Sequence, residues 1–346
     1  MLRYVRIVAA RTMEFAMTLA RPTRGGADAS APMIRVYSGP SRRSRALRTV
    51  LQVTVRPVIQ AWGYAPNLPW PYGVIDWAAK ALWPLPGTLV DKVRLPYCDG
   101  EFIRGPGAHS DRVLLYLHGG AFICCGPNTH RRFVSDISRA CRAPALVVDY
   151  RMLPGHPVST SLDDCVDGYR WLLQQGYTPD QIVVAGDSAG GYFALMTALA
   201  VVERGFGKPA AVVCQSPFID TDPSRKLEWL GDMVDPLFPA IGLVSLIARM
   251  TEFERSNGHP DEYGRVHSPL YLDVSGLPPV LIQAGASELL SVDAELIAAK
   301  IAEEGVPCEL QLFEGQFHVF QAAADLIPEG RKAIDNIGAF VRANVG

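Results

Sequence analysis

The chain has 346 residues, of which 49% are hydrophobic and 20% are charged. This composition provides a large buried core and excludes an intrinsically disordered protein. The net charge is only −2, but residues 1–56 contain 11 arginines against two acidic residues, a local charge of +9 that leaves −11 on the remainder. We therefore expect a basic arm on an acidic body, which argues against nucleic-acid binding.

Residues 2–21 have the pattern of an amphipathic helix, with polar and apolar arcs at about 100° per residue. Two interpretations stay open: the helix packs its apolar face on the body, or it binds an anionic membrane surface. Arg11 and Glu14 interrupt the apolar run, which disfavours a signal peptide. No run reaches the ~18 apolar residues of a membrane span. We expect a cytoplasmic protein, with peripheral membrane contact as the alternative.

Seven cysteines occur at positions 98, 124, 125, 141, 165, 214 and 308. None forms a C-x-x-C pair, so a zinc ribbon and a thioredoxin-like site are excluded. Most lie in apolar contexts, and we expect buried free thiols in a reducing compartment. The sequence indicates neither a metal nor an organic cofactor.

The chain changes character near residue 91. Residues 1–90 are rich in Arg, Pro and Trp, which predicts helices with proline-marked corners and no regular sheet. After this point, strands are predicted at 113–117, 145–149, 181–185, 211–214, 279–284 and 308–313. Helices are predicted at 162–174, 189–203, 294–304 and 329–344. This alternation predicts an α/β protein with a parallel sheet covered by helices on both faces. Residues 220–272 break the rhythm and are interpreted as a helical insert.

The most informative stretch is Gly186-Asp187-Ser188-Ala189-Gly190. It follows a predicted buried strand and precedes an apolar, alanine-rich helix. A serine on such a sharp strand-to-helix turn is held with its hydroxyl exposed, and the flanking glycines avoid steric clashes. Ser188 is therefore the candidate nucleophile.

A serine nucleophile needs a base, and the base needs an orienting carboxylate. His318 follows the last predicted strand, where a loop opens at the carboxyl edge of the sheet, and it is the expected base. His259 and His267 lie in the polar insert and are interpreted as surface residues. Glu288, in the loop after the preceding strand, is the expected acid. Asp293 is the alternative, although it is better explained as part of the N-cap region of the next helix, where a carboxylate satisfies free N–H groups.

Ester cleavage also needs N–H donors for the oxyanion. The stretch Leu117-His118-Gly119-Gly120-Ala121-Phe122 follows a strand and contains two glycines through which the backbone can approach a substrate. Together with Ala189, Gly119 and Gly120 would form a three-donor oxyanion hole. His118 is interpreted as a structural residue that orients this loop.

In these motifs the chain resembles the hormone-sensitive-lipase-like (family IV) esterases of the α/β-hydrolase fold. The matching stretches, in the family's order, are His118 to Phe122, Asp149-Tyr150-Arg151, Gly186 to Gly191, Ser216-Pro217, Gly285-x-x-Glu288-x-Leu290 and Gly315-x-x-His318-x-Phe320. The resemblance implies a Ser188–His318–Glu288 triad and a cap over the site. The cap would be built from residues 1–90 and the insert at about 220–272, on a catalytic domain of residues 91–346. The chain departs from the family pattern in three places. Ala121 replaces the last glycine of the loop motif, Glu replaces the commoner Asp, and Pro154-Gly155-His156-Pro157 lacks the carboxylate that the family often has there.

The predicted function is hydrolysis of carboxylic esters with short to medium acyl chains through an acyl-enzyme. Phe122 and Tyr192 are the expected substrate-binding residues. Residues 237, 238 and 241 and the tryptophans at 62, 70, 77 and 83 either line an acyl pocket or pack the cap. Alternatives are an amide or lactone hydrolase, a lipid hydrolase at a membrane, and a non-catalytic small-molecule-binding protein of the same fold. A homodimer is a further possibility.

Overall fold

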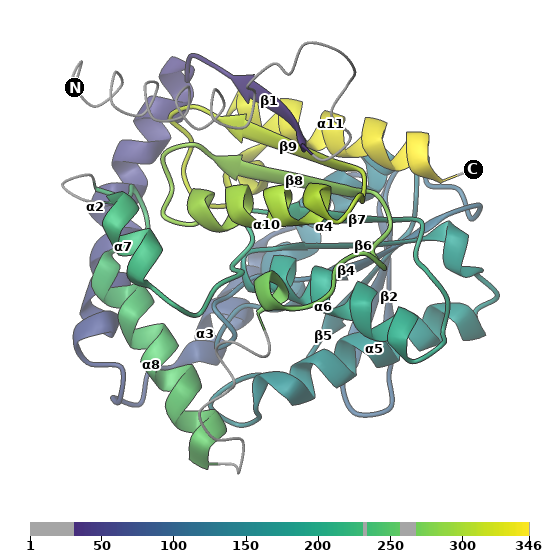
Figure 1. Cartoon of the computed structure of the whole chain (residues 1–346), viewed down its shortest axis with the longest axis horizontal. Coiled ribbons are helices and arrows are strands. Elements are labelled where there is room, and N and C mark those ends of the chain that lie inside the picture. Colours follow the sequence, from purple (N-terminus) through teal and green to yellow (C-terminus); the bar gives the residue numbers. More distant parts are fainter. Residues whose placement is uncertain (1–30, 231–233, 257–267, 346) are drawn as a thin grey trace.

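The computed structural model describes residues 31–230, 234–256 and 268–345. Its centre is a nine-stranded sheet with the order β1-β9-β8-β7-β6-β4-β5-β3-β2 (Figure 1). The strands are β1 (Met33–Tyr37), β2 (Leu89–Arg94), β3 (Asp99–Arg104), β4 (Val113–Leu117), β5 (Ala145–Asp149), β6 (Ile182–Asp187), β7 (Ala211–Gln215), β8 (Val280–Gly285) and β9 (Cys308–Phe313). All neighbours are parallel except the β2–β3 and β3–β5 pairs.

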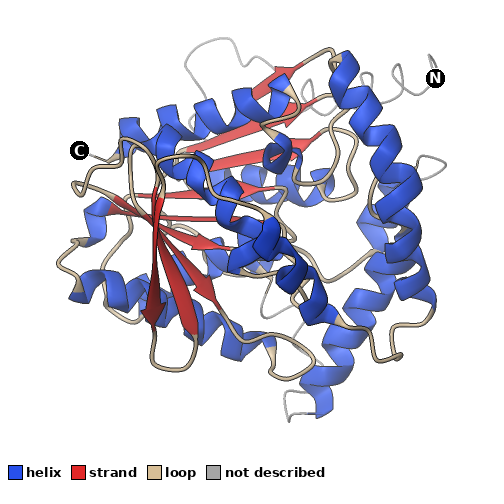
Figure 2. Cartoon of the chain, turned by 180° about the vertical axis from the view of Figure 1, so that it is seen from behind, coloured by secondary structure: helices blue, strands red, loops and turns tan. Residues whose placement is uncertain are grey.

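Helices cover both faces of the twisted sheet (Figure 2). They are α2 (Arg42–Tyr64), α3 (Tyr72–Ala78), α4 (Pro127–Cys141), α5 (Val158–Gln174), α6 (Ala189–Glu203), α7 (Ser224–Leu230), α8 (Ala240–Ser256), α10 (Ser291–Glu303) and α11 (Pro328–Asn344). Short 3₁₀ turns are η1 (Ala79–Ala81), η2 (Pro179–Gln181), η3 (Pro269–Tyr271) and η4 (Phe320–Ala323).

The core forms on both faces because side chains alternate along each strand. In β4, Leu115 and Leu117 belong to the core that also contains residues of α5, α6 and α10, whereas Leu114 and Tyr116 belong to the core that contains residues of α4 and α11. All five residues of β4 are buried, as the continuous apolar runs of a parallel sheet require. The predicted α/β class is confirmed.

The six predicted strands agree with the structure to within two residues at each end, and α5 begins four residues before its predicted start. The prediction that residues 1–90 contain no regular sheet is wrong, because β1 pairs in parallel with β9. Edge strand β1 has three exposed residues among its five, and its partner lies far along the chain, so no local apolar run marks it. The β2–β3 hairpin and α4 were also not predicted.

Two helices from separate parts of the chain lie side by side at one end of the sheet (Figures 1 and 2). Helix α2 belongs to the N-terminal segment and α8 to the insert. A Cβ atom on Gly63 would lie 2.9 Å from the backbone nitrogen of Gly242, so these glycines permit the close crossing. Ser245 Oγ also donates a hydrogen bond to the Gly63 carbonyl at 2.6 Å.

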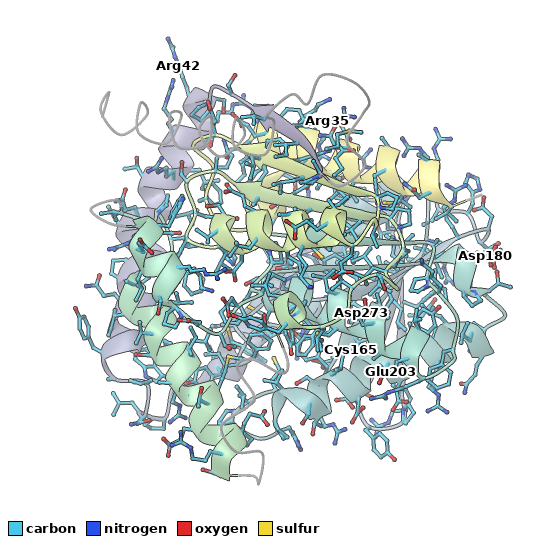
Figure 3. The ribbon with its side chains drawn as sticks, viewed as in Figure 1. Arg35, Arg42, Cys165, Asp180, Glu203 and Asp273 are labelled. Carbon is cyan, nitrogen blue, oxygen red and sulfur yellow. The ribbon has the colours of Figure 1, made fainter. Side chains whose placement is uncertain are left out.

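None of the helices within the described residues is long and apolar enough to cross a membrane. The predicted amphipathic segment 2–21, together with His259 and His267, lies outside those residues. At the start of α2, the side chain of Arg42 points away from the body (Figure 3). All seven cysteines are free; five are buried, and the Sγ atoms of Cys124 and Cys125 are 3.9 Å apart.

The turn from β6 into α6 packs against the end of β4. A Cβ atom on Gly190 would lie 1.9 Å from the Leu117 carbonyl oxygen, and one on Gly186 would lie 2.2 Å from the Gly190 carbonyl oxygen. Both contacts involve backbone atoms, which cannot move without displacing a central strand or α6. Only glycine fits at these two positions.

We therefore expect Gly190→Ala to destabilise the protein by at least about 3 kcal/mol, because the new methyl group overlaps a buried carbonyl. Gly73→Ala in α3 is the matched control, since nothing lies within 4 Å of its Cβ position. It should change stability by no more than about 1 kcal/mol. Urea denaturation followed by circular dichroism measures both variants, and equal effects would contradict this packing.

Candidate active site

Ser188 occupies the turn between β6 and α6 in a backbone conformation that is rare for a residue with a side chain, φ 54° and ψ −118°. Hydrogen bonds hold it there. Its N–H donates to the Gln215 carbonyl at 2.8 Å, and its carbonyl accepts from the N–H groups of Gly191 and Phe218 at 3.0 Å each. The surrounding strands and α6 thus maintain the strained turn.

The structure brings Ser188, His318 and Glu288 together at the carboxyl edge of the sheet. Ser188 Oγ lies 2.9 Å from His318 Nε2, and His318 Nδ1 donates to Glu288 Oε2 at 3.0 Å. Glu288 Oε1 accepts the N–H of Gly285 at 3.1 Å, which fixes the second carboxylate oxygen. The three loops that follow β6, β8 and β9 deliver these side chains.

Asp293, the alternative acid, lies elsewhere. Its carboxylate accepts the backbone N–H groups of Ile219 and Asp220 and pairs with Lys226 Nζ at 2.8 Å. It stands in the first turn of α10 as expected, but it does not cap that helix, whose N-cap is Leu290. The capping explanation was wrong because the insert folds back onto α10 and brings a buried lysine, which needs a counter-charge.

The pKa of His318 is raised above its ordinary value of 6.5. Burial is the largest influence and acts in the opposite direction, because it disfavours the charged imidazolium. The hydrogen bond and charge of Glu288 more than offset burial, with smaller contributions from Asp235 and Asp187. The protonated form of His318 is therefore more stable in this site than a free imidazolium is in water.

The loop after β4 lies beside Ser188, but the N–H groups that are free to bind an oxyanion are not the predicted set. The Gly119 N–H donates to Asp187 Oδ1 at 3.1 Å, and Gly119 does not line the pocket beside the serine. Within the part of the chain that the structure describes, the N–H groups of Gly120, Ala121 and Ala189 meet no acceptor. This geometry contradicts Gly119 as a free donor and leaves the other three available.

Asp187 connects this loop to the strand that carries the nucleophile. Besides Gly119, its carboxylate accepts the Tyr116 hydroxyl at 2.8 Å and lies 3.3 Å from His130 Nε2. Burial opposes a charge on His130, but the Asp187 carboxylate more than compensates and raises the pKa of His130 to about 9. The same pairing overcomes burial and lowers the pKa of Asp187. An ion pair therefore underlies the loop at neutral pH.

His118 is buried behind the loop, as its structural interpretation requires. Its ring stacks on Tyr150 with centroids 4.2 Å apart, and its Nδ1 lies 2.7 Å from the Gly119 carbonyl oxygen. Burial lowers the pKa of His118 to about 4, so the ring is neutral at physiological pH.

A small apolar pocket adjoins Ser188, with a volume of about 10 Å³, room for about one water molecule. It is lined by Ala121, Phe122, Ser188, Ala189, Phe218, Phe238, Leu243, Leu246, Leu289 and Leu290. The predicted Phe122 and Phe238 are among these residues. Tyr192 is not, and instead packs edge-on against Phe122 at 5.7 Å.

None of the tryptophans at 62, 70, 77 and 83 lines this pocket, nor do residues 237 and 241. Trp77 and Trp83 are 67% and 80% exposed, so packing of a cap core was also the wrong explanation for them. Sequence reasoning missed the leucines of the lining. Leu289 and Leu290 come directly after the candidate acid, and this position in the sequence could have indicated that they line the pocket. Nothing in the sequence around Leu243 and Leu246 of α8 indicates a place in the pocket.

Within the described residues, no group of three His, Cys, Asp or Glu side chains is arranged to hold a metal ion. The chemistry available at the site is that of a serine hydroxyl, an imidazole, a carboxylate and backbone N–H groups. These are the components of a serine hydrolase.

Comparison with known proteins gives the same class. Residues 114–322 match the alpha/beta hydrolase fold family. The esterase LipU of Mycobacterium tuberculosis is 42% identical over 301 residues, which cover 85% of this chain and all of that protein. The carboxylesterase/phospholipase LipF of the same organism is 39% identical over 319 residues, which cover 90% of this chain and 84% of that protein.

A solved esterase from the bacterial hormone-sensitive lipase family superposes with a TM-score of 0.75 at 31% identity, covering 89% of this chain and all of that one. The chain therefore belongs to the α/β-hydrolase family and, within it, to the esterases of the hormone-sensitive lipase type. It is a carboxylesterase or lipase-like hydrolase.

Proposed function

We propose that this protein hydrolyses carboxylic esters with short to medium acyl chains, with Ser188 as nucleophile, His318 as base and Glu288 as orienting acid. The observation that carries the proposal is the unbroken chain of contacts from Ser188 Oγ to His318 and on to Glu288, at 2.9 and 3.0 Å. At the first distance a proton can pass from the serine hydroxyl to the imidazole, and at the second the carboxylate can orient the imidazole ring.

In the proposed reaction, His318 Nε2 takes the proton of Ser188 as the oxygen attacks the ester carbonyl. His318 then donates that proton to the departing alcohol, which leaves an acyl group on Ser188. Water, activated by the same imidazole, releases the acid and restores the serine. Glu288 keeps Nδ1 protonated throughout, so that Nε2 is free to accept.

The oxyanion of each tetrahedral intermediate is proposed to bind the N–H groups of Gly120, Ala121 and Ala189. These groups meet no acceptor among the described residues, and Ala121 and Ala189 line the pocket. Ala189 is the first residue of α6, where the helix dipole also favours negative charge. This set replaces the predicted Gly119 with Ala121.

The preference for short to medium acyl chains is supported by the small pocket. Its lining is apolar apart from Ser188, and the aromatic and leucine side chains leave little free volume. A long acyl chain would require a larger displacement of these lining side chains than a short one. Ester hydrolysis is also supported by the similarity to LipU, named an esterase, and LipF, named a carboxylesterase/phospholipase.

The contact between α2 and α8 supports a cap that the N-terminal segment and the insert build together over a catalytic domain. The predicted boundary at residue 91 does not separate the two, because β1 (Met33–Tyr37) belongs to the central sheet. Membrane contact through residues 2–21, a homodimer and a cytoplasmic location stay predictions.

Ser188→Ala should lower kcat for p-nitrophenyl butyrate by at least about 10³-fold, because no other hydroxyl occupies the turn. In wild type, kcat/KM measured from acetate to palmitate should peak at short or medium chains. Ser275→Ala, at an exposed serine, is the control and should match wild type. Retained activity in Ser188→Ala would contradict the proposal.

The raised pKa of His318 predicts the pH dependence. A base must be neutral to accept a proton, so kcat/KM should rise with pH and inflect above 6.5. Glu288→Gln removes the charge that favours the imidazolium, so the inflection should move to lower pH, and kcat should fall by about 10³- to 10⁴-fold. An unshifted inflection in this variant would exclude Glu288 as the partner of His318.

A further inference from the structure

Asp235 is a buried carboxylate in the insert, between α7 and α8, and only 2% of its surface is exposed. Its Oδ1 accepts the backbone N–H groups of Leu237 and Phe238 at 2.7 and 2.6 Å, forming a tight local turn. Its Oδ2 accepts the N–H of Leu289 at 2.5 Å. One side chain therefore joins the insert to the loop of the candidate acid.

Two of the three residues that donate to this carboxylate, Phe238 and Leu289, lie beside the catalytic pair. Phe238 lines the pocket and packs edge-on against the His318 ring, with centroids 5.3 Å apart and planes at 82°. Leu289 lines the same pocket and directly follows Glu288. The position of each thus depends on a bond to Asp235.

The N-terminal segment also contacts Asp235. Arg56 of α2 donates from Nε to the backbone carbonyl of Asp235 at 3.1 Å. Three parts of the chain that are far apart in sequence, namely α2, the insert and the loop after β8, are therefore connected through Asp235.

We propose that Asp235 is a positioning residue that holds Phe238 and the Glu288–Leu289 loop in register, and thereby limits the acyl length and aligns the catalytic histidine. The consequence for activity rests on the proposed ester hydrolysis, whereas the structural connection does not. Burial disfavours the charged carboxylate and raises the pKa of Asp235, whereas the N–H groups of Phe238, Leu237 and Leu289 act in the opposite direction.

The substitution Asp235→Asn separates the two connections. An amide has one oxygen, so it can keep the turn to Leu237 and Phe238 while its NH₂ group faces the N–H of Leu289. The NH₂ group and the Leu289 N–H are both donors, so the hydrogen bond to the acid loop is lost. Asp222→Asn is a matched control. Asp222 Oδ1 accepts the N–H of Ser224 at 2.9 Å in a similar turn of the same insert, but the side chain is exposed, and within the described residues no hydrogen bond joins it to the acid loop.

The first measurement is backbone amide exchange, which needs no turnover. In Asp235→Asn, exchange at Leu289 should accelerate by about 10-fold or more relative to wild type, while exchange at Phe238 stays slow. Asp222→Asn should leave both unchanged. Unaltered exchange at Leu289 in Asp235→Asn would overturn the proposed connection, whether or not the protein hydrolyses esters.

The second measurement is the acyl-length profile with p-nitrophenyl acetate, butyrate and octanoate. Asp235→Asn should lower kcat for acetate by about 10-fold, because the Glu288 loop loosens, and raise the octanoate-to-acetate ratio of kcat/KM by about 5-fold or more. A folded variant with the wild-type ratio and kcat would refute the positioning role.

Phe238→Ala keeps the proposal testable if Asp235→Asn does not fold. It removes one wall of the pocket without touching the carboxylate, so the octanoate-to-acetate ratio should rise in the same direction. An unchanged ratio would overturn Phe238 as the limiting wall. A wild type with no activity on any ester would instead refute the proposed function, and the exchange result would still decide the connection through Asp235.

Discussion

The backbone turn at Ser188 is the constraint on which the rest of the site depends. Its positive φ is unfavourable for a serine and persists only because β6, β7 and α6 fix it from several sides. Gly186 and Gly190 let these elements come within backbone contact of each other and of β4. The hydroxyl is thus presented at the sheet edge, where the loops after β8 and β9 bring Glu288 and His318 to it.

Buried carboxylates around this turn differ in role because their partners differ. Glu288 faces the imidazole of His318, Asp293 faces the ammonium of Lys226, and Asp187 faces His130 and the loop after β4. All three are buried. Local contacts, and not proximity to the serine in sequence, decide which one orients the base. Asp187 is adjacent to Ser188 in the chain, yet its bonds hold the neighbouring loop.

Much of this arrangement could be predicted from the sequence. The central strands are continuous apolar runs, and the motifs around Ser188, Glu288 and His318 each follow such a run in an order typical of the fold. The missing parts depend on contacts between distant residues. The edge strand β1 is defined by its pairing with β9. The Gly119 N–H is occupied because the Asp187 carboxylate lies within hydrogen-bond distance of it. The role of Asp293 depends on Lys226, which lies about 70 positions away in the sequence. The pocket wall from α8 has no local signature for the same reason.

Activation of Ser188 by His318 is the step on which catalysis at this site depends. An organophosphate that phosphorylates activated serines tests this directly, with intact-mass measurement and peptide mapping of the product. We expect one adduct per chain on Ser188, none in Ser188→Ala, and labelling slowed by about 10³-fold in His318→Ala. An adduct on another residue, or labelling of His318→Ala at the wild-type rate, would contradict it.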